Sequence, residues 1–282
     1  MKNNIDNLDI SLMTNADLEF AVKMTDDERW GYLPTDFEKL MAFEPEGCFV
    51  ARVDNRYAGI ITTTSYADYA FVGSLIVNPV YRGKMIGEQL LSQAMAYLKN
   101  RGVKTIELDG VFAAVSLYRR LGFRDKYLSL RFFRPAGKIV RAGKIALSEP
   151  SREIIEFDRK HTNIERTRIL ERYLREYRDS TYIVQDPFLS GYAFVRPRAE
   201  GKLMVGPMVA LSSKTAGLLW NAIMTAYAKY VLGVGVPEHN RTMIRLLNKS
   251  GFYYNSPSLR MFWGKKKEYE KNIYGILSPE KG

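Results

Sequence analysis

The sequence is poor in the residues that crosslink chains and bind metals. Of its 282 residues one is a cysteine, Cys48, and two are histidines, His161 and His239. A single cysteine excludes an internal disulfide and is typical of a reducing compartment. Two histidines far apart in the sequence, with no cysteine spacing beside them, form no metal-ligand pattern. We therefore expect a cytoplasmic protein that needs no metal.

Long hydrophobic runs are also lacking. No apolar stretch approaches the roughly 20 residues that span a membrane, and the first residues are polar and acidic, unlike a signal peptide. We therefore expect no membrane partner. Hydrophobic residues make up 46% of the chain and aromatic residues 12%, a composition that favours packed cores over disorder. A chain of this length is expected to form two domains.

Positive charge is concentrated in the second half. Residues 1–130 hold 15 Lys and Arg against 17 Asp and Glu, whereas residues 131–282 hold 27 against 14. A basic excess can attract nucleic acid, acidic substrates or the phosphates of a cofactor. Between Arg152 and Arg178 the charges alternate in sign, which indicates a salt-bridged helix surface rather than a nucleic-acid stripe.

The most informative stretch is a basic, glycine-bearing turn at residues 78–87. Leu75–Val77 before it is typical of a buried strand end, and apolar residues over 86–98 recur at helical spacing. Such a turn would direct backbone N–H groups and the positive end of the helix dipole at one point, which suits a phosphate. Arg82 and Lys84 add charge there. The competing interpretation is an ordinary loop with two solvated cations.

The segment after this helix predicts a second strand and a short helix. Residues 103–109 alternate apolar and polar side chains, and 113–121 read as helical. Gly122 is expected to end that helix in the left-handed conformation, with Phe123 folding back as the hydrophobic contact.

These motifs resemble the GNAT family of acyl-CoA-dependent N-acetyltransferases. Arg82-x-x-x-x-Gly87 resembles the family's pyrophosphate loop, and Leu117-Tyr118-x-x-x-Gly122-Phe123 resembles its Leu-Tyr-x-x-x-Gly-Phe ending. Two residues depart from the pattern. Met85 replaces the middle glycine of the loop, where a side chain is tolerated if φ is negative, and Val111 replaces a frequent asparagine.

The resemblance implies an α/β fold (α+β mixed sheet) of tandem GNAT-like domains, each with a central mixed β-sheet flanked by helices. Two parallel strands in each sheet would splay apart, and acetyl-CoA, as co-substrate, would pair with the strand edge between 72–77 and 105–110. An acceptor amine would then attack the thioester directly. The positions implied to contact acetyl-CoA are Leu75, Ile76, Val77, Arg82, Gly83, Lys84, Met85, Ile86, Gly87 and Tyr118.

Catalytic roles are also implied by the resemblance. Tyr118 occupies the position of the family's acid, and a phenol with a pKa of about 10 suits a thiol leaving group. Asp109 is the candidate base, and Glu107 on the same strand face is its alternative. Both carboxylates could instead cap a strand end or pair with cations. Trp30 and Tyr32 are candidate substrate-wall residues, with an ordinary core role as the alternative.

Cys48 belongs to the apolar strand start at 47–50, so we expect a buried, inert thiol.

The second half resembles a degenerate copy of the first. Gly206–Ala210 parallels Gly73–Val77, and helix, strand and capped helix follow at similar spacing. The functional positions diverge, because Ser212–Gly217 replaces the phosphate loop and Leu247 replaces the candidate acid. Asn240 occupies the position of Val111 in the first copy. We predict an acetyl-CoA-binding GNAT domain over 1–134 and a degenerate GNAT-like domain over 135–282, joined by a packed linker near 134–148.

Three functions of different classes stay open. The first is an N-acetyltransferase acting on a small-molecule or peptide amine, with the second domain shaping the acceptor site. The second is a non-catalytic acyl-CoA-binding regulatory protein. The third is a nucleic-acid-associated protein that uses the basic half, and its affinity would fall steeply with salt. Transfer of an aminoacyl group is a variant of the first. Because GNAT proteins often dimerise, a homodimer is a further expectation.

Overall fold

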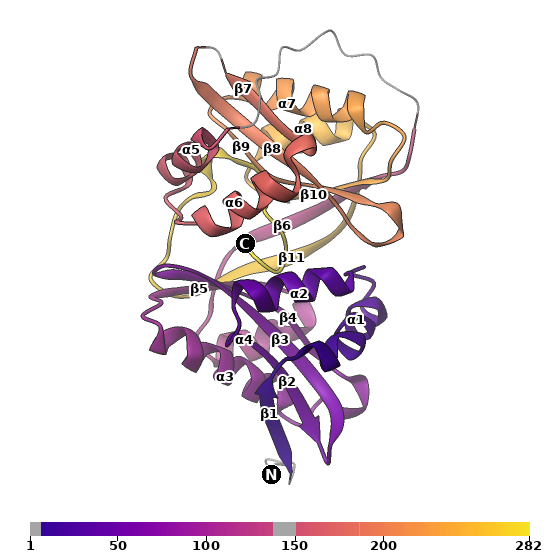
Figure 1. Cartoon of the computed structure of the whole chain (residues 1–282), viewed down its shortest axis with the longest axis vertical. Helices are drawn as coiled ribbons and strands as arrows, with labels where there is room; N and C mark the ends of the chain where they lie inside the picture. The colour runs from indigo at the N-terminus through magenta and orange to yellow at the C-terminus, as the bar shows by residue number, and fades with distance from the viewer. Residues whose placement is uncertain (1–6, 138–150, 186) are drawn as a thin grey trace. The chain divides into compact units, whose positions relative to one another are not determined.

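The computed structural model describes residues 7–137, 151–185 and 187–282, which form two compact units (Figure 1). Unit 1 consists of residues up to Asp125 together with Met261–Lys266 and Glu280–Gly282, and unit 2 consists of Lys126–Arg260 and Lys267–Pro279. The predicted domain boundary at residues 134 and 135 falls at the end of a strand of unit 2. Most of the predicted linker lies outside the described residues.

Unit 1 is a mixed sheet with helices on both faces. Its strands follow the order β1-β2-β3-β4-β5, with the end of β11 beyond β5, and only the β4–β5 pair within β1–β5 is parallel. The elements are β1 (Leu8–Leu12), α1 (Leu18–Asp27), α2 (Pro34–Phe43), β2 (Cys48–Val53), β3 (Arg56–Tyr66), β4 (Tyr69–Val77), α3 (Ile86–Asn100), β5 (Thr105–Gly110) and α4 (Val115–Arg120).

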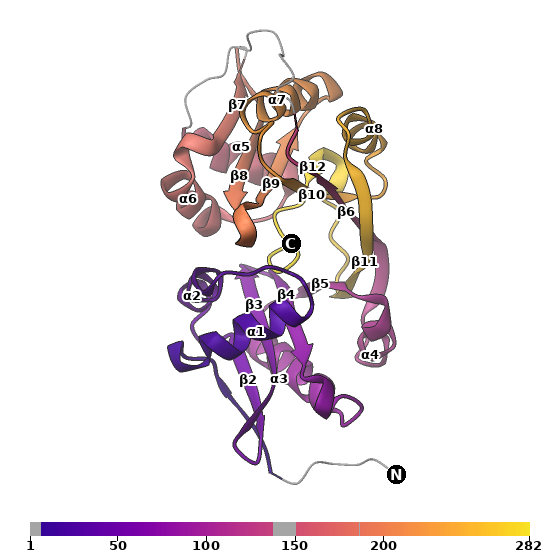
Figure 2. The same ribbon diagram turned by 90° about the vertical axis from the view of Figure 1, so that its right-hand side faces the viewer.

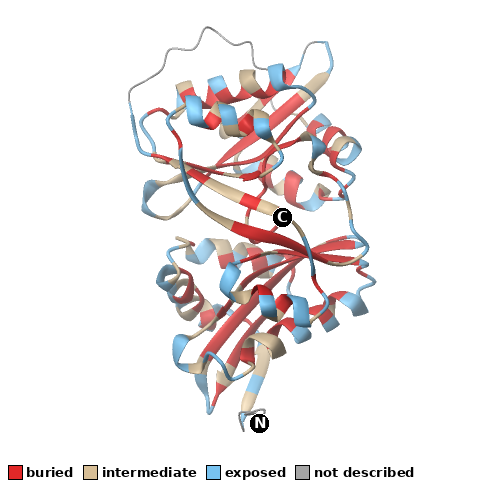
Figure 3. Cartoon of the chain, turned by 180° about the vertical axis from the view of Figure 1, so that it is seen from behind, coloured by how far each residue is buried: buried red, intermediate tan, exposed pale blue. Residues whose placement is uncertain are grey.

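Side-chain alternation assigns the two faces of this sheet. Cys48, Val50 and Ile60 pack in one cluster with α1 and α2, whereas Phe49, between Cys48 and Val50, packs edge-on against Tyr97 of α3. The strands are largely buried in Figure 3, and the exposed positions lie on the outer faces of the helices. Cys48 is fully buried, as predicted.

A bulge in β4 separates it from β5. The two strands pair from Tyr69 and Thr105 as far as Val72 and Leu108. Ser74 then takes a left-handed conformation with φ of 50°, and the β3–β4 register shifts there. Because the bulge turns the strand away, no residue pair joins β4 to β5 beyond Val72 within the described chain. The predicted gap therefore begins after residue 72 on β4, as expected, and after residue 108 on β5 rather than at residue 105.

Unit 2 repeats this plan with β7-β8-β9-β10 in the order and sense of β2-β3-β4-β5. In Figure 1, α5 and α6 lie on one face of its sheet and α7 on the other. The elements are β6 (Arg124–Arg134), α5 (Glu153–Thr162), α6 (Thr167–Glu176), β7 (Thr181–Gln185), β8 (Leu189–Pro197), β9 (Leu203–Ala210), α7 (Ser213–Ala226), β10 (Leu232–Pro237), α8 (Arg241–Lys249), β11 (Tyr253–Gly264) and β12 (Ile273–Gly275).

The two sequence repeats exchange strands. The strand after α4, β6, pairs with β10 of unit 2, from Arg134 opposite Leu232 to Ser129 opposite Pro237. The strand after α8, β11, ends beside β5 of unit 1 (Figure 2). The Lys265 N–H donates to the Lys104 carbonyl (3.2 Å) at this junction. Each sheet is thus completed by a strand from the other repeat.

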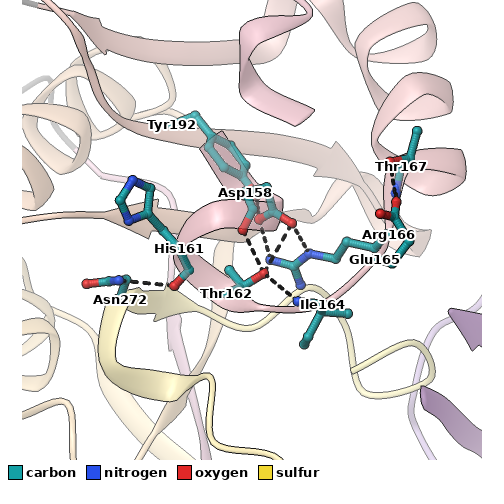
Figure 4. Close-up of polar contacts among 9 residues, drawn as sticks. All are labelled: Asp158, His161, Thr162, Ile164, Glu165, Arg166, Thr167, Tyr192 and Asn272. Atoms are coloured by element: carbon teal, nitrogen blue, oxygen red, sulfur yellow. Dashed lines mark hydrogen bonds and ion pairs between the residues drawn. The ribbon is translucent and has the colours of Figure 1, made fainter. Parts of the chain in front are cut away.

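A buried ion pair fixes the turn between α5 and α6 (Figure 4). The Asp158 carboxylate accepts hydrogen bonds from Nε and Nη2 of Arg166, both 2.8 Å long, and another from the Tyr192 hydroxyl. Asp158 and Arg166 are both buried. The alternating charges of this region predicted surface salt bridges, and Arg172–Glu176 is one. The charge pattern did not reveal that Asp158 and Arg166 are interior residues.

Candidate active site

The basic turn of unit 1 leads into α3 through two residues of positive φ. Asn78 begins it by accepting a hydrogen bond from the Val80 N–H (3.2 Å). Gly83 has φ of 78° and Met85 has φ of 62°. Met85 therefore does not have the negative φ at which we expected a side chain to be tolerated. Met85 takes the left-handed conformation that glycine adopts freely, at a cost of roughly 1–2 kcal/mol for other residues.

Two polar contacts hold the Arg82 side chain beside the end of β4. Its Nε donates to the Val77 carbonyl (2.9 Å), the last residue of β4, and its Nη2 pairs with Glu28 (2.6 Å). The side chain is 53% exposed, so its charge still faces water. Lys84 lies over the Tyr81 ring, with Nζ 5.5 Å from the ring centroid. Both cations thus stand beside the start of α3.

The first turn of α3 has free hydrogen-bond donors. Met85 is the N-cap residue, and no side chain among the described residues accepts a capping hydrogen bond there. A Cβ at Gly87 would meet Val77 at 3.4 Å, an ordinary contact, so the protein itself does not require this glycine. The uncapped N–H groups at the start of α3 could bind a phosphate, and the lack of a side chain at Gly87 leaves room for it.

The β4 edge beyond the bulge lies beside this seat. Leu75 and Val77 are half-buried and Ile76 is buried. Ile76 pairs with Ile60 of β3 on the inner side, which leaves the opposite edge toward the gap. The Ser74 hydroxyl is buried and lacks a hydrogen-bond partner in the described chain. An extended polar ligand would satisfy both the strand edge and this orphaned hydroxyl.

Tyr118 of α4 lies at the far side of the gap. Its ring occupies the space above Gly110, where a Cβ would lie 2.7 Å from Cε2, and it contacts Phe123 edge-on at 6.2 Å. Gly122 has φ of 87°, as predicted for the helix end. Burial raises the pKa of Tyr118 above its usual value. No hydrogen bond to its hydroxyl occurs within the described ranges, so the phenol keeps its proton available.

The two candidate bases differ in position. Glu107 is fully buried, accepts a hydrogen bond from the Tyr69 hydroxyl (3.1 Å), and pairs with Phe71, where the strands still run together. Asp109 follows the end of the pairing and is partly exposed. Asp109 is therefore the one that borders the gap.

Trp30 and Tyr32 precede α2 and contact each other, with ring centroids 6.4 Å apart. Trp30 is half-buried, and Tyr32 is only 4% exposed. The Tyr32 hydroxyl donates to Oε2 of Glu280 (2.9 Å), so a residue 248 positions away completes this corner of unit 1. No sequence signal links these residues, because neither motif nor periodicity reaches across that separation.

Family models match both repeats. Residues 18–123 match the model of the acetyltransferase (GNAT) family, and residues 154–275 match the model of an acetyltransferase (GNAT) domain. The chain belongs to the GNAT family of acetyltransferases. It is an acyltransferase with two GNAT domains, as the sequence motifs predicted.

Relatives and solved structures agree with this assignment. The holothin acyltransferase of Pseudoalteromonas sp. (strain SANK 73390) is 25% identical, over 90% of this chain and 88% of that protein. The crystal structure of a proposed acetyltransferase from Pyrococcus horikoshii has a TM-score of 0.82 at 24% identity, covering 98% of this chain and 96% of that one. A tandem GNAT protein from the clavulanic acid biosynthesis pathway has a TM-score of 0.61 at 15% identity, covering 93% and 100%.

The second GNAT domain has a bulge and a strand gap like those of unit 1, but a later segment of the chain fills its gap. β9 and β10 pair only from Leu203 to Val205 among the residues described. β12 then pairs with β9, with Ile273 opposite Val209, and the Ile276 N–H donates to the Gly235 carbonyl of β10 (2.8 Å). The chain itself therefore occupies the position that is open in unit 1.

The start of α7 is satisfied as well. The Ser212 side chain accepts a hydrogen bond from the Thr215 N–H (3.1 Å) and caps the helix. Asn240 caps α8 by accepting from the Met243 N–H (2.9 Å) and donates its amide to the Ile273 carbonyl (2.7 Å). Asn240 thus holds β12 rather than a ligand, and Leu247 is a core residue.

The histidines of the GNAT chain are packing residues, and its described part holds no metal group. In residues 7–137, 151–185 and 187–282, no group of three or more His, Cys, Asp and Glu could hold a metal ion. His161 packs on Phe157, with ring centroids 4.6 Å apart, and His239 packs on Tyr127, with ring centroids 5.2 Å apart. In the same part of the chain, no helix combines the length and apolar character needed to cross a membrane.

Proposed function

We propose that the chain transfers an acetyl group from acetyl-CoA to a primary amine, and that the reaction takes place in unit 1. The observation that supports this most strongly is the contrast at the β-bulges. In unit 1 the strand gap and the helix start are both unsatisfied by the described residues, whereas in unit 2 β12 and Ser212 satisfy them.

The residues present fit acetyl-CoA. The β4 edge at Gly73–Val77 would pair with the amides of the pantetheine, and the orphaned Ser74 hydroxyl offers a further polar partner. The N–H groups at the start of α3, with Arg82 and Lys84 beside them, would hold the diphosphate. Acetyl-CoA supplies an activated thioester carbon.

Tyr118 would donate the proton that the leaving thiolate requires. The amine nitrogen forms a bond to the thioester carbon, the C–S bond breaks, and the phenol protonates the sulfur. The raised pKa of Tyr118, caused by its burial, keeps the phenol protonated at neutral pH. The acceptor's own proton must leave to a base, because an ammonium with a pKa of about 10.4 has no lone pair to attack with.

Calorimetric titration of the full chain with acetyl-CoA tests the proposal. Arg82→Glu and Lys84→Glu should each weaken binding by about 10- to 100-fold, because each replaces a charge-assisted contact with repulsion. Lys214→Glu is the control, since Lys214 is an exposed lysine in the first turn of α7, and it should leave binding unchanged. Absence of binding by the wild-type chain, or loss in the Lys214 variant alone, would overturn the proposal.

The acceptor can then be sought by measuring thiol release. Holothin is the first amine to test, because the relative named for it aligns over 90% of this chain. Spermidine, glucosamine and lysine amide extend the panel to polyamines, amino sugars and peptide-like lysine.

A further inference from the structure

The segment Glu280–Gly282 lies on the α1–α2 face of unit 1 at the point where β4 leaves β5. A Cβ at Gly73 would come within 2.6 Å of Glu280 Cα and 2.8 Å of its carbonyl oxygen. Gly73 directly follows Val72, the last β4 residue paired with β5. The absence of a side chain at Gly73 thus admits the Glu280 backbone against the strand at the beginning of the gap.

The Glu280 carboxylate is held at both oxygens. Oε2 accepts from the Tyr32 hydroxyl (2.9 Å) and Oε1 pairs with Lys281 Nζ (2.6 Å). The Lys281 carbonyl in turn accepts from the Tyr66 hydroxyl (2.9 Å). Glu280 is 1% exposed and Lys281 is 8% exposed. A phenol and an ammonium both donate to this group, as they do to an ionised carboxylate.

Unsatisfied hydroxyls lie on the same face of the sheet. Thr62 pairs with Gly73, and Thr64 pairs with Phe71, so their side chains share the face that Glu280 covers. Both threonines are fully buried, and neither hydroxyl has a partner within the described residues. Buried polar groups are normally hydrogen-bonded, and two orphaned hydroxyls on the face that Glu280 covers indicate a place for a polar molecule.

The other carboxylates of this face are less well placed. Glu107 lies where β4 and β5 still pair, opposite Phe71. Asp109 borders the gap from the β5 side and is partly exposed. Glu280 is buried, and its backbone and Cβ lie against Gly73 on the β4 side, where β4 leaves β5.

We propose that Glu280 is the proton acceptor for the amine, and that Tyr32 and Lys281 are positioning residues that hold it; this inference rests on the proposed function. The acceptor enters as an ammonium and gives one proton to Glu280. The neutral nitrogen bonds to the thioester carbon, the C–S bond breaks, and Tyr118 protonates the sulfur. The nitrogen's second proton restores Tyr118, and Glu280 releases its proton to water, so one proton is freed for each acetyl group transferred.

The test is the pH profile of thiol release by the full chain between pH 5 and 10. The amine is the best acceptor of the four-member panel, and water serves as acceptor if none reacts. Glu280→Gln should lower kcat by about 10²–10⁴-fold and abolish the acidic limb of the profile, while the Kd for acetyl-CoA stays within threefold. Glu280→Asp should retain the acidic limb of the profile, with a kcat below that of the wild type. Glu46→Gln, a change at an exposed unit 1 carboxylate, is the matched control.

The outcomes separate this inference from the proposed function. A wild-type chain that fails to bind acetyl-CoA refutes the proposed function itself. Binding with an unchanged acidic limb in Glu280→Gln, or a limb lost only in Asp109→Asn, overturns the role of Glu280 alone. Binding without thiol release to any acceptor instead refutes the transfer reaction of the proposed function, and the role of Glu280 with it. If Glu280→Gln does not fold, Glu280→Gln with Lys281→Met keeps the pair neutral, and the same profile is measured on that variant.

Discussion

The two GNAT domains share a β-bulge and differ in what lies beyond it. In unit 1 the strands part after Val72, and in unit 2 they part after Val205. The glycine at the bulge contacts a late segment of the chain in both, since a Cβ at Gly73 would meet Glu280 and one at Gly206 would meet the Ile276 carbonyl at 2.1 Å. The same architecture therefore supports either a ligand site or a structural strand.

The helix start and the strand gap change together between the two domains. Unit 1 has an uncapped α3 beside an open gap, and unit 2 has a serine-capped α7 beside a filled one. A side-chain cap satisfies the N–H groups that a phosphate would otherwise take. The predictions below test whether this local difference decides which domain works.

The largest effect is expected from Tyr118→Phe. Removing the hydroxyl removes the leaving-group acid, so kcat should fall by about 10²–10⁴-fold. Acetyl-CoA affinity and stability should stay the same, because the ring still fills the space above Gly110. Steady-state thiol release and calorimetry measure both. Tyr230→Phe, at an exposed position of unit 2, is the control, and an unchanged kcat in Tyr118→Phe would remove the acid from the mechanism.

The same residue predicts the alkaline side of the pH profile. Tyr118 acts in its protonated form, and burial raises its pKa, so the loss of that form moves to higher pH. The wild-type kcat should therefore show no decline between pH 8 and 10. A decline with a midpoint near 9 would show that another acid, or an unburied tyrosine, protonates the thiolate.

The third prediction uses Cys48 as a reporter of unit 1. Burial raises the pKa of its thiol to about 12, so a thiol reagent should label it only when the unit opens. A ligand bound to unit 1 at 100 times its Kd should slow labelling about 100-fold. Hydrogen exchange in α7 should not change. Protection of α7 with unchanged Cys48 labelling would assign acetyl-CoA to the second domain instead.

A smaller effect is expected from Ser212→Ala. Loss of the α7 cap should reduce the free energy of unfolding by about 1 kcal/mol, measured by urea titration, without altering the Kd for acetyl-CoA. Ser213→Ala, one residue into the helix, is the control. A change in acetyl-CoA affinity on removing the cap would mean that α7 is still a working anion site.

The smallest effect is expected from Met85→Gly. Relief of the left-handed strain and the added flexibility of glycine oppose each other, so stability should change by less than about 1 kcal/mol. Acetyl-CoA affinity should be retained. Thr215→Gly, in the first turn of α7, should lose more than about 1 kcal/mol, because residue 215 is helical and buried. Equal losses in the two variants would contradict the observed backbone of Met85.

The sequence was sufficient for the local features of the site. Helical periodicity predicted α3 and α7, Gly122 marked the end of α4, and the motifs around Arg82 and Tyr118 carried the resemblance to the GNAT family that the family model confirms. These features depend on neighbours within a few residues or on one motif. The positive φ at Met85 was missed because a side chain normally disfavours it.

Long-range features were beyond the sequence pattern. The exchange of β6 and β11, the insertion of β12 and the contact of Glu280 with Tyr32 all join segments that no periodicity links. Charge alternation likewise could not show that Asp158 and Arg166 are buried partners. Pairing over such separations is decided by which surfaces remain unpaired once the local elements have formed.

The strand exchange also has a consequence for the order of folding. Unit 1 includes Met261–Lys266 and Glu280–Gly282, so its sheet stays incomplete while the first half of the polypeptide emerges from the ribosome. Contacts of such high sequence separation form slowly, and an exposed β5 edge would meanwhile be open to other chains. We expect a fragment ending near residue 135 to aggregate rather than fold, and synthesis of the second repeat to be the step that makes the first repeat competent.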